Sequence, residues 1–420
     1  MENDGLKKTS GAILILNIKG LVQVRETTNS FVAGTSQAEL PVLQDAFLLI
    51  RDGLIADYGA MKNLRDPAVP SIDASDSYVF PCFVDSHTHL VYAASREKEF
   101  VQKIKGATYE EIAAKGGGIL NSAKVLQSVS EDRLLELSLP RAWEIIRSGT
   151  GAVEIKSGYG LTIKDEIKML KVAKRIGKET PLKVKTTFLG AHAVPAGIKK
   201  DDYINSVIHE MIPAVAEQKL ADYIDVFCEQ GFFSQAETER ILEAGKSAGM
   251  RPKVHANQLH RSGGVQAGVK TGAISVDHLE NIGDEEISLL LNTSTMPTVL
   301  PGAAFFLNLP FPPARKMLTD GLPVAIASDF NPGSSPSGNM PLMISLACIR
   351  MKMTPEEAFN AATINSAYAI DLLQTHGSIT RGKVANVFIT RPMPAIEYMP
   401  YSFGSSLIDK VILNGKQVYG

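Results

Sequence analysis

The sequence predicts an α/β protein: a (β/α)8, or TIM, barrel with a second, smaller composite β-sandwich domain formed by both chain ends. The chain has 420 residues, of which 45% are hydrophobic and 21% charged. This composition is typical of a globular protein, and the length accommodates a barrel of about 250 residues with a further unit. Strands and amphipathic helices alternate over residues 79–378. We therefore expect the barrel there, and the composite domain at 1–78 together with 379–420.

Both chain ends have the pattern of short strands joined by tight turns. Arg51-Asp52-Gly53 and Asn414-Gly415 are turn sequences of the hairpin type. Since each end is too small to bury a core alone, we expect the two ends to pair. The strands expected here cover residues 12–16, 46–50, 54–58, 385–390, 407–413 and 417–419.

The middle of the chain repeats an apolar strand, a polar loop and an amphipathic helix. Eight strands are expected, at 79–85, 152–156, 183–190, 224–228, 252–255, 273–277, 295–300 and 323–328. The clearest helices are expected at 164–178, 202–218, 235–248 and 284–292. A doubly wound open sheet is the competing fold, but no G-x-G-x-x-G follows an early strand.

Charge and cysteine content restrict the partners and the compartment. Lys and Arg number 43 against 45 Asp and Glu, a net charge of −2, so we expect neither nucleic acid nor a membrane as partner. Cys82, Cys228 and Cys348 form no CxxC pair, which favours a reducing cytoplasm. The apolar run 12–16 is too short for a signal or membrane segment. A small-molecule substrate is expected.

Histidines and acids follow the predicted barrel strands, where barrel enzymes carry their functional groups. Five of the eight histidines lie at such strand ends. These groups are His87, His89, His192, His255, His278 and Asp329.

His87 and His89 form an H-x-H pair on an extended segment, so both imidazoles point to the same side. Taken alone, the pair could be a chance or surface arrangement. With His255 and Asp329 it gives three nitrogens and one carboxylate, a set suited to Zn²⁺ or Fe²⁺ with a position left for water.

The segment Pro81-Cys82-Phe83-Val84-Asp85-Ser86-His87-Thr88-His89 resembles the P-G-x-[VI]-D-x-H-x-H opening of the amidohydrolase superfamily, with Cys82 where glycine is usual. Further motifs resemble the imidazolonepropionase family: Ser95-Arg96-Glu97-Lys98-Glu99, Gly116-Gly117-Gly118-Ile119, Glu154 to Leu161, Gly190-Ala191-His192-Ala193 and Asp329 to Pro336. This resemblance implies a homodimeric hydrolase of cyclic amides that opens the ring of 4-imidazolone-5-propanoate, giving N-formimidoyl-L-glutamate in histidine breakdown.

The resemblance also implies the metal ligands, which are His87, His89, His255 and Asp329. One divalent metal per chain is expected because the fourth barrel strand ends in Phe227-Cys228-Glu229-Gln230 and offers no lysine for a second ion. Whether Glu229 approaches the metal is left open. His278 is expected to contact the attacking water or the developing oxyanion, and its alternative is a histidine bonded to the backbone.

Two further residues are expected to take part in catalysis. Asp329 would accept a proton from the water and deliver it to the leaving ring nitrogen. Gln258 stands where related deaminases carry glutamate. An amide cannot transfer protons, so Gln258 is expected to hydrogen-bond the ring or the water instead.

Substrate recognition needs a cation for the propanoate and polar groups for the ring. Arg96 is expected to pair with the carboxylate, and Tyr159 and His192 with the ring. Each has a structural alternative, as a solvated arginine, a packing aromatic or a structural histidine. The other substrate-binding candidates are Tyr109, the Asn331 amide, the backbone at Gly333 and the Ser334 hydroxyl, although the last three could form an ordinary turn.

Two competing functions remain. One is a deaminase or another cyclic amidohydrolase with the same barrel, against which Gln258 and the loops of Tyr159 and Asn331 argue. The other is an inactive relative that binds a metabolite. Loss of a metal ligand would indicate an inactive relative, but all four ligand positions are filled.

Overall fold

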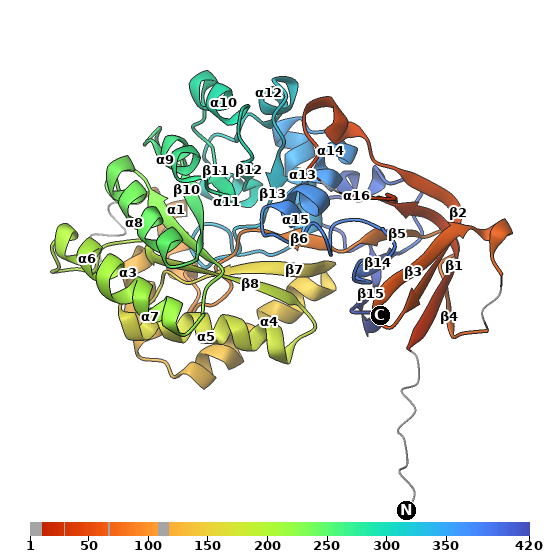
Figure 1. The fold of residues 1–420 in the computed structure, drawn as a ribbon, viewed down its shortest axis with the longest axis horizontal. Coiled ribbons are helices and arrows are strands. Elements are labelled where there is room, and N and C mark those ends of the chain that lie inside the picture. The colour runs from red at the N-terminus through yellow and green to blue at the C-terminus, as the bar shows by residue number, and fades with distance from the viewer. Residues whose placement is uncertain (1–10, 29, 66–67, 108–116) are drawn as a thin grey trace, which may run out of the picture.

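The computed structural model describes residues 11–28, 30–65, 68–107 and 117–420. Figure 1 shows two units, a barrel surrounded by helices and a β-sheet at one end of the molecule. Each unit contains an eight-stranded sheet. The barrel and the separate sheet from the chain ends confirm the predicted fold class.

The barrel sheet is parallel throughout and follows the chain order from β6 to β13. Its strands are β6 (Phe83–Asp85), β7 (Thr150–Lys156), β8 (Lys183–Ala191), β9 (Tyr223–Cys228), β10 (Arg251–Ala256), β11 (Ser275–His278), β12 (Met296–Val299) and β13 (Ala325–Ile326). All eight predicted strands therefore have a counterpart within a few residues of the expected bounds.

The two end strands of this order, β6 and β13, meet just beyond their carboxyl ends. Thr88 and Phe330 form an isolated parallel bridge. The Asp329 N–H donates to the His87 carbonyl at 3.0 Å, and the His89 N–H donates to the Phe330 carbonyl at 3.0 Å. The backbone seam of the barrel thus lies beside the predicted metal ligands.

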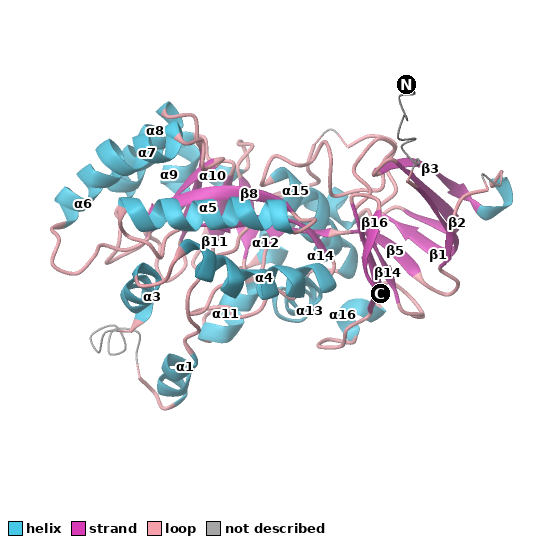
Figure 2. Cartoon of the chain, turned by 90° about the horizontal axis from the view of Figure 1, so that it is seen from below, coloured by secondary structure: helices cyan, strands magenta, loops and turns pink. Residues whose placement is uncertain are grey.

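Helices cover the outside of the barrel (Figure 2). Serine and threonine side chains cap several of them; Ser130, Thr162 and Ser234 accept an N–H in the first turns of α4, α5 and α8. Within the described residues, the helices of this unit are α1 (Glu97–Ile104), α3 (Gly118–Gln127), α4 (Glu131–Arg147), α5 (Ile163–Glu179), α6 (Lys200–Ser206), α7 (Ile212–Glu217), α8 (Gln235–Ser247), α9 (Gly264–Thr271), α10 (Asp284–Leu290), α11 (Pro301–Leu307), α12 (Ala314–Thr319), α13 (Met340–Met351), α14 (Pro355–Asn360) and α15 (Ser366–Tyr368).

The helix expected over 202–218 is divided. A π-helical turn, η3 (Val207–Met211), separates α6 from α7. Pro213 has no N–H to continue the α-helical ladder, and the Ile212 N–H bonds to the Val207 carbonyl instead. A second π turn, η4 (Ala361–Asn365), joins α14 to α15.

The second sheet combines strands from both chain ends, drawn red and blue in Figure 1. Its order is β16-β15-β14-β5-β1-β2-β3, with β4 on β1. The strands are β1 (Ala12–Val22), β2 (Val42–Arg51), β3 (Leu54–Ala60), β4 (Ser71–Asp73), β5 (Tyr78–Pro81), β14 (Val387–Thr390), β15 (Ile408–Leu413) and β16 (Lys416–Tyr419). Short helices η1 (Gly34–Ala38), η2 (Met61–Asn63) and α16 (Tyr398–Tyr401) complete the ends. Ile15, Leu48, Val387 and Ile412 share one buried cluster, so both ends contribute to its core.

The segment 79–85, expected as one strand, pairs with both sheets. The Cys82 N–H donates to the Asn386 carbonyl at 2.9 Å, on the side of the end sheet. The next residue, Phe83, donates to the Gly149 carbonyl at 2.9 Å, on the side of the barrel. The chain therefore changes partners between Cys82 and Phe83, which divides the expected strand into β5 and β6.

Among the described residues, no helix combines the length and the apolar composition needed to cross a bilayer.

Candidate metal centre and active site

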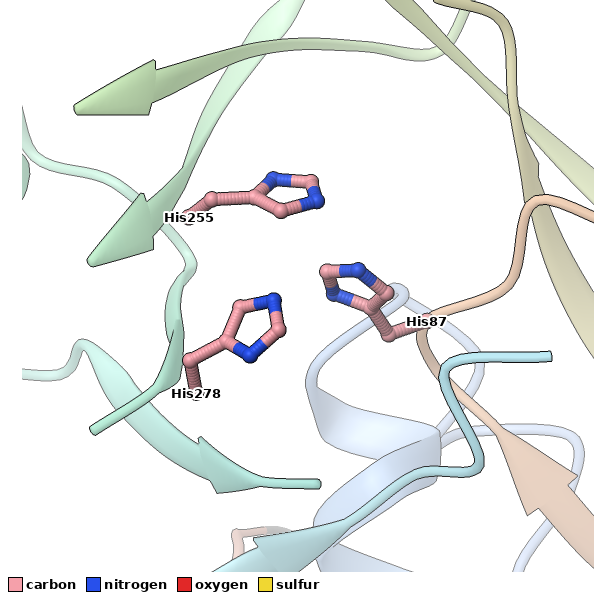
Figure 3. A group of neighbouring side chains, drawn as sticks. All are labelled: His87, His255 and His278. Carbon is pink, nitrogen blue, oxygen red and sulfur yellow. The ribbon is translucent and has the colours of Figure 1, made fainter. Parts of the chain in front are cut away.

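Three histidines converge at the carboxyl end of the barrel. His87 follows β6, His255 lies in β10 and His278 ends β11, and Figure 3 shows their rings facing a common space. One ligand nitrogen from each lies within 4.8 Å of the others. All three side chains are buried.

A second group shares His87 and adds His89 and Asp329. The Asp329 Oδ1 atom lies 3.5 Å from His87 Nε2 and 3.6 Å from His89 Nε2. His89 Nε2 also lies 3.3 Å from His255 Nε2. The four predicted metal ligands are therefore neighbours, together with His278.

Carboxylates behind the histidines fix which nitrogen faces this space. His87 Nδ1 bonds to Asp277 Oδ2 at 2.7 Å, and His255 Nδ1 lies 2.9 Å from Asp225 Oδ2. A carboxylate only accepts, so His87 Nδ1 carries the hydrogen and its Nε2 presents a lone pair. The Asp225 carboxylate beside His255 Nδ1 favours the same arrangement for His255. Burial lowers the pKa of His87 and His89 well below the usual range, which keeps both rings neutral.

This arrangement fits a cation. The buried His87 Nε2 has no hydrogen-bond partner in the described part of the chain. It faces further lone pairs, from His255 and from the Asp329 carboxylate. A group of converging acceptors without donors is what a metal ion requires of its ligands.

Beneath the histidines, the barrel interior contains a buried charge network. Lys156 Nζ lies 2.6 Å from Glu154 Oε1 and 2.9 Å from Asp225 Oδ2. Lys253 Nζ pairs with the other Glu154 oxygen and donates to the Ser86 carbonyl at 2.9 Å. Although burial opposes a charge here, the carboxylates of Asp225 and Glu154 raise the pKa of Lys156. The two lysines thus compensate the negative charge of the carboxylates that contact the metal-site histidines.

The turn after β13 holds Asp329. Ser334 Oγ donates to Asp329 Oδ2 at 3.0 Å. The Asn331 side chain donates to the Asp329 carbonyl and to Ser334 Oγ, both at 2.6 Å, and accepts the N–H groups of Gly333 and Ser334 at 2.7 and 2.8 Å. The amide is fully used within the turn, so its predicted contact with substrate stays a prediction.

His278 has a strained backbone, with φ at 90°, a conformation that costs free energy and is commonly kept at functional sites. Its Nδ1 lies 3.5 Å from Glu280 Oε1. Burial opposes a charge on the ring, but the carboxylates of Glu280, Asp329 and Asp277 outweigh it and raise the pKa of His278. The structural alternative of a backbone-bonded histidine has no support among its described contacts.

A cavity of about 770 Å³ opens above the cluster. Most predicted site residues line it: His89, Arg96, Tyr159, His192, His255, Gln258, His278, Asp329, Asn331, Gly333 and Ser334. His87 is fully buried beside it. Tyr109 lies outside the described residues. The walls also include the aromatic side chains of Phe227 and Phe232, which suit a flat ring.

Tyr159 and His192 lie together on one wall, with ring centroids 5.4 Å apart. His192 Nδ1 bonds to the Gly158 carbonyl at 3.0 Å, so its hydrogen is on Nδ1 and its Nε2 is a free acceptor. Burial lowers the pKa of His192 to about 3, so the ring is neutral at physiological pH. Arg96 lies over the Tyr159 ring, with Cζ 5.6 Å from the centroid.

Glu166, in the first turns of α5, holds the loop that carries Tyr159. Its Oε2 accepts the Gly158 N–H at 2.9 Å, and its Oε1 accepts those of Gly160 and Leu161, both at 2.8 Å. Gly158 has a φ of +110°, and a Cβ there would meet His192 Nδ1 at 2.8 Å. This loop therefore depends on both the glycine and the carboxylate.

Replacing Glu166 with glutamine should loosen this loop. The amide NH₂ cannot accept, so at least one backbone N–H loses its partner, at a cost of about 1–3 kcal/mol. We expect a lower melting temperature and a higher KM, measured by differential scanning fluorimetry and steady-state kinetics. Glu179→Gln, at the exposed end of the same helix, is the control. If Glu166→Gln matches the wild type in both readouts, Glu166 does not hold the loop.

Glu229 holds the loop that carries Gln258, as Glu166 holds the loop that carries Tyr159. Its Oε2 accepts the Leu259 N–H at 2.8 Å and its Oε1 lies 3.1 Å from His260 Nδ1. The Gln258 carbonyl accepts a hydrogen from Asn281 Nδ2 at 2.8 Å. In the described structure Glu229 is part of neither histidine cluster.

Several residues of the site did not emerge from the sequence. Asp225 and Asp277 were visible only as charges in apolar strands, a pattern that places them inside the barrel but does not identify their histidine partners. Glu166 and the cavity-lining Lys103 gave no signal, because their contacts depend on how the neighbouring loops fold. The sequence raised Glu229 only as a possible neighbour of the metal, and its bonds to Leu259 and His260 come from the tertiary structure.

The chain is similar to known proteins over nearly its whole length. The amidohydrolase family matches residues 78–418. The chain is 55% identical to an imidazolonepropionase of Flavobacterium johnsoniae, covering 96% of this chain and 99% of the relative. It is 54% identical to an imidazolonepropionase of Christiangramia forsetii, covering 97% and 100%.

The fold is shared more widely. A crystal structure of a zinc-bound adenosine deaminase from Xanthomonas campestris matches with a TM-score of 0.71 at 17% identity, covering 97% of this chain and 92% of that one. Such a distant likeness concerns the fold alone. Together with the His/Asp cluster, the fold indicates a divalent-metal site. Since the family match and the close relatives both span nearly the whole chain, the chain belongs to the amidohydrolase family and, within it, to the imidazolonepropionases.

Proposed function

We propose that the protein is a hydrolase that opens the ring of 4-imidazolone-5-propanoate by cleaving a cyclic amide C–N bond, giving N-formimidoyl-L-glutamate in histidine breakdown. The observation that carries this is the buried His/Asp cluster at the base of a cavity that also contains Arg96, Tyr159 and His192. Relatives of that name at 54–55% identity support the choice of substrate.

The proposed metal is one divalent ion per chain, Zn²⁺ or Fe²⁺, held by His87, His89, His255 and Asp329. Histidine nitrogens with one carboxylate suit either ion. When bound, such an ion supplies a Lewis acid that polarises a carbonyl and acidifies water.

Asp329 is proposed to move the proton. It accepts a hydrogen from the attacking water and delivers it to the ring nitrogen, which takes the electron pair of the broken C–N bond. The water oxygen remains on the carbonyl carbon as part of a new carboxyl group, which releases the second proton of the water to solvent and becomes a carboxylate. Support comes from Ser334, which binds Asp329 Oδ2 and leaves Oδ1 toward the histidines.

His278 and Gln258 are proposed to hydrogen-bond the reacting groups without taking the proton that Asp329 transfers. The raised pKa of His278 beside Glu280 supports a protonated ring that donates to the developing oxyanion. Gln258 lines the cavity and would hydrogen-bond the ring or the water without exchanging protons.

Recognition is proposed to use neighbouring side chains of the cavity wall, where Arg96 lies over the Tyr159 ring. Arg96 binds the propanoate, and Tyr159 and His192 bind the ring, with His192 Nε2 accepting a ring N–H. Tyr109, Asn331, Gly333 and Ser334 are the further proposed contacts, and Asn331 would exchange one of its turn hydrogen bonds for the substrate. We also propose a homodimer in the cytoplasm.

Turnover tests this function directly. The metal-loaded protein should convert 4-imidazolone-5-propanoate, generated in situ from urocanate, into N-formimidoyl-L-glutamate, and a chelator-stripped sample should not. Restoring Zn²⁺ or Fe²⁺ should restore the rate, and elemental analysis of the native protein identifies the ion. A metal-loaded protein that forms no product would exclude this substrate.

A further inference from the structure

A second cation faces the cavity beside Arg96. Lys103, near the end of α1, lines the same wall as Arg96, Gly333 and Ser334. Within the described part of the chain, neither Lys103 nor Arg96 forms an ion pair with a carboxylate. Figure 2 shows α1 at the edge of the barrel. Two cations on one wall of a cavity suggest an anionic ligand.

Both cations meet at Gly333. Lys103 Nζ donates to the Gly333 carbonyl at 3.2 Å. A Cβ at Gly333 would lie 2.3 Å from Arg96 Nη1, so the guanidinium packs directly against this glycine. Gly333 is therefore common to both side chains and brings their charges together.

Each cation keeps hydrogen-bond donors that the described residues do not use. Arg96 Nε donates to Ser122 Oγ at 2.9 Å, but its Nη2 is buried without a partner. A lysine ammonium has three donors, and the Gly333 carbonyl takes one. The neighbouring Glu99 accepts the Gly118 N–H at 3.0 Å and forms no ion pair with either cation within the described residues, although its charge raises the pKa of Lys103 and offsets part of the opposing effects.

The charges of Arg96 and Lys103 also favour an anionic ligand. Burial, with the charge of Arg96, lowers the pKa of Lys103. Two like charges near each other in a partly buried site are costly, and an anion bound between them removes the cost. A carboxylate, with two oxygens and four lone pairs, matches the free donors.

We propose that Lys103 and Arg96 together form the subsite for the carboxylate of the substrate side chain, with Lys103 as a specificity-determining residue. The inference rests on the proposed function, because it assigns the cavity end that receives the propanoate. It predicts a preference for cyclic amides with an acidic side chain over those with a neutral one.

The test compares Lys103→Met, Lys103→Arg and Lys105→Met on two substrates, the natural acid and its propanamide analogue. Lys105 is exposed and lies outside the cavity wall, so it is the matched control. Lys103→Met should raise KM for the acid by about 10- to 100-fold with little change in kcat. It should leave KM for the amide unchanged, and Lys103→Arg should restore most of the loss. Equal effects on acid and amide, or no effect on either, would overturn the proposal.

A binding measurement separates this inference from the proposed function. Calorimetry with 3-(imidazol-4-yl)propanoate, which the enzyme cannot hydrolyse, requires no turnover. Tight binding that Lys103→Met weakens supports the subsite even if the wild type fails to open the imidazolone ring. Conversely, a wild type that turns over the acid, with a Lys103→Met variant that binds and reacts equally well, retains the function and rejects the subsite. Absence of binding to the wild type rejects it as well.

Discussion

Asp329→Asn is expected to lower kcat by about 10²–10⁴-fold, the range typical for loss of a general acid–base group. Asparagine keeps the shape but cannot take a proton. It also weakens the set of acceptors, because Oδ1 faces both His87 Nε2 and His89 Nε2. Steady-state kinetics and the metal content of the purified variant, measured by elemental analysis, report the two effects separately.

The matched control is Asp284→Asn, since the Asp284 side chain is 84% exposed and lies at the start of α10. It should retain wild-type kinetics. A metal-loaded Asp329→Asn variant that turns over at a rate near the wild type would remove Asp329 from the proposed proton route.

Lys156→Met is expected to have the largest effect on stability. The change removes the cation between Glu154 and Asp225. Glu154 keeps Lys253, but the buried Asp225 carboxylate loses its lysine partner. Breaking a buried ion pair from one side costs about 3–5 kcal/mol of unfolding free energy. Urea denaturation, followed by circular dichroism, measures the loss.

Two further variants test the cause of that loss. Lys316→Met removes an exposed lysine that also pairs with two acids and should cost no more than about 1 kcal/mol. Adding Asp225→Asn to Lys156→Met should recover part of the stability, since Asp225 pairs with no other lysine among the described residues and its uncompensated charge is then gone. An unfolding free energy unchanged by Lys156→Met would show that the network tolerates its charge imbalance.

The fold could be predicted from the sequence because its periodicities are strong. Apolar runs such as 152–156 and 224–228 are fully buried strands in the structure, and helical patterns fill the intervals. Residues 79–85 show where periodicity is insufficient. An apolar run predicts extended backbone, but the exchange of partners at Cys82 depends on Asn386 and Gly149, which are distant in the sequence.

Which residues gather at the site could be predicted from the barrel fold. Strand ends of a barrel meet at one face, so His87, His255 and His278 could be grouped without knowing their neighbours. The pairings could not. His255 approaches Asp225 because of the register of β9 and β10, and His87 bonds to Asp277 of β11 across the barrel interior.

Asn331 illustrates a further limit. Its position after Asp329 fits both a substrate contact and a turn, and both use the same amide atoms. In the structure the turn takes all of them. Competition between tertiary contacts for the same donors is invisible in a linear pattern.

The seam between β6 and β13 has a consequence for how the barrel holds its shape. Ladder bonds join the other neighbouring strands, whereas here the closure consists of the bridge between Thr88 and Phe330 with its two backbone hydrogen bonds and the bonds that Ser328 donates to the Asp85 carboxylate. His87 and His89 stand on one side of that seam and Asp329 on the other. An ion held by all three would act as a cross-link between the first and last strands, so its binding free energy would add to resistance against local opening. The proposed catalytic metal would then also stabilise the closure of the barrel between β6 and β13.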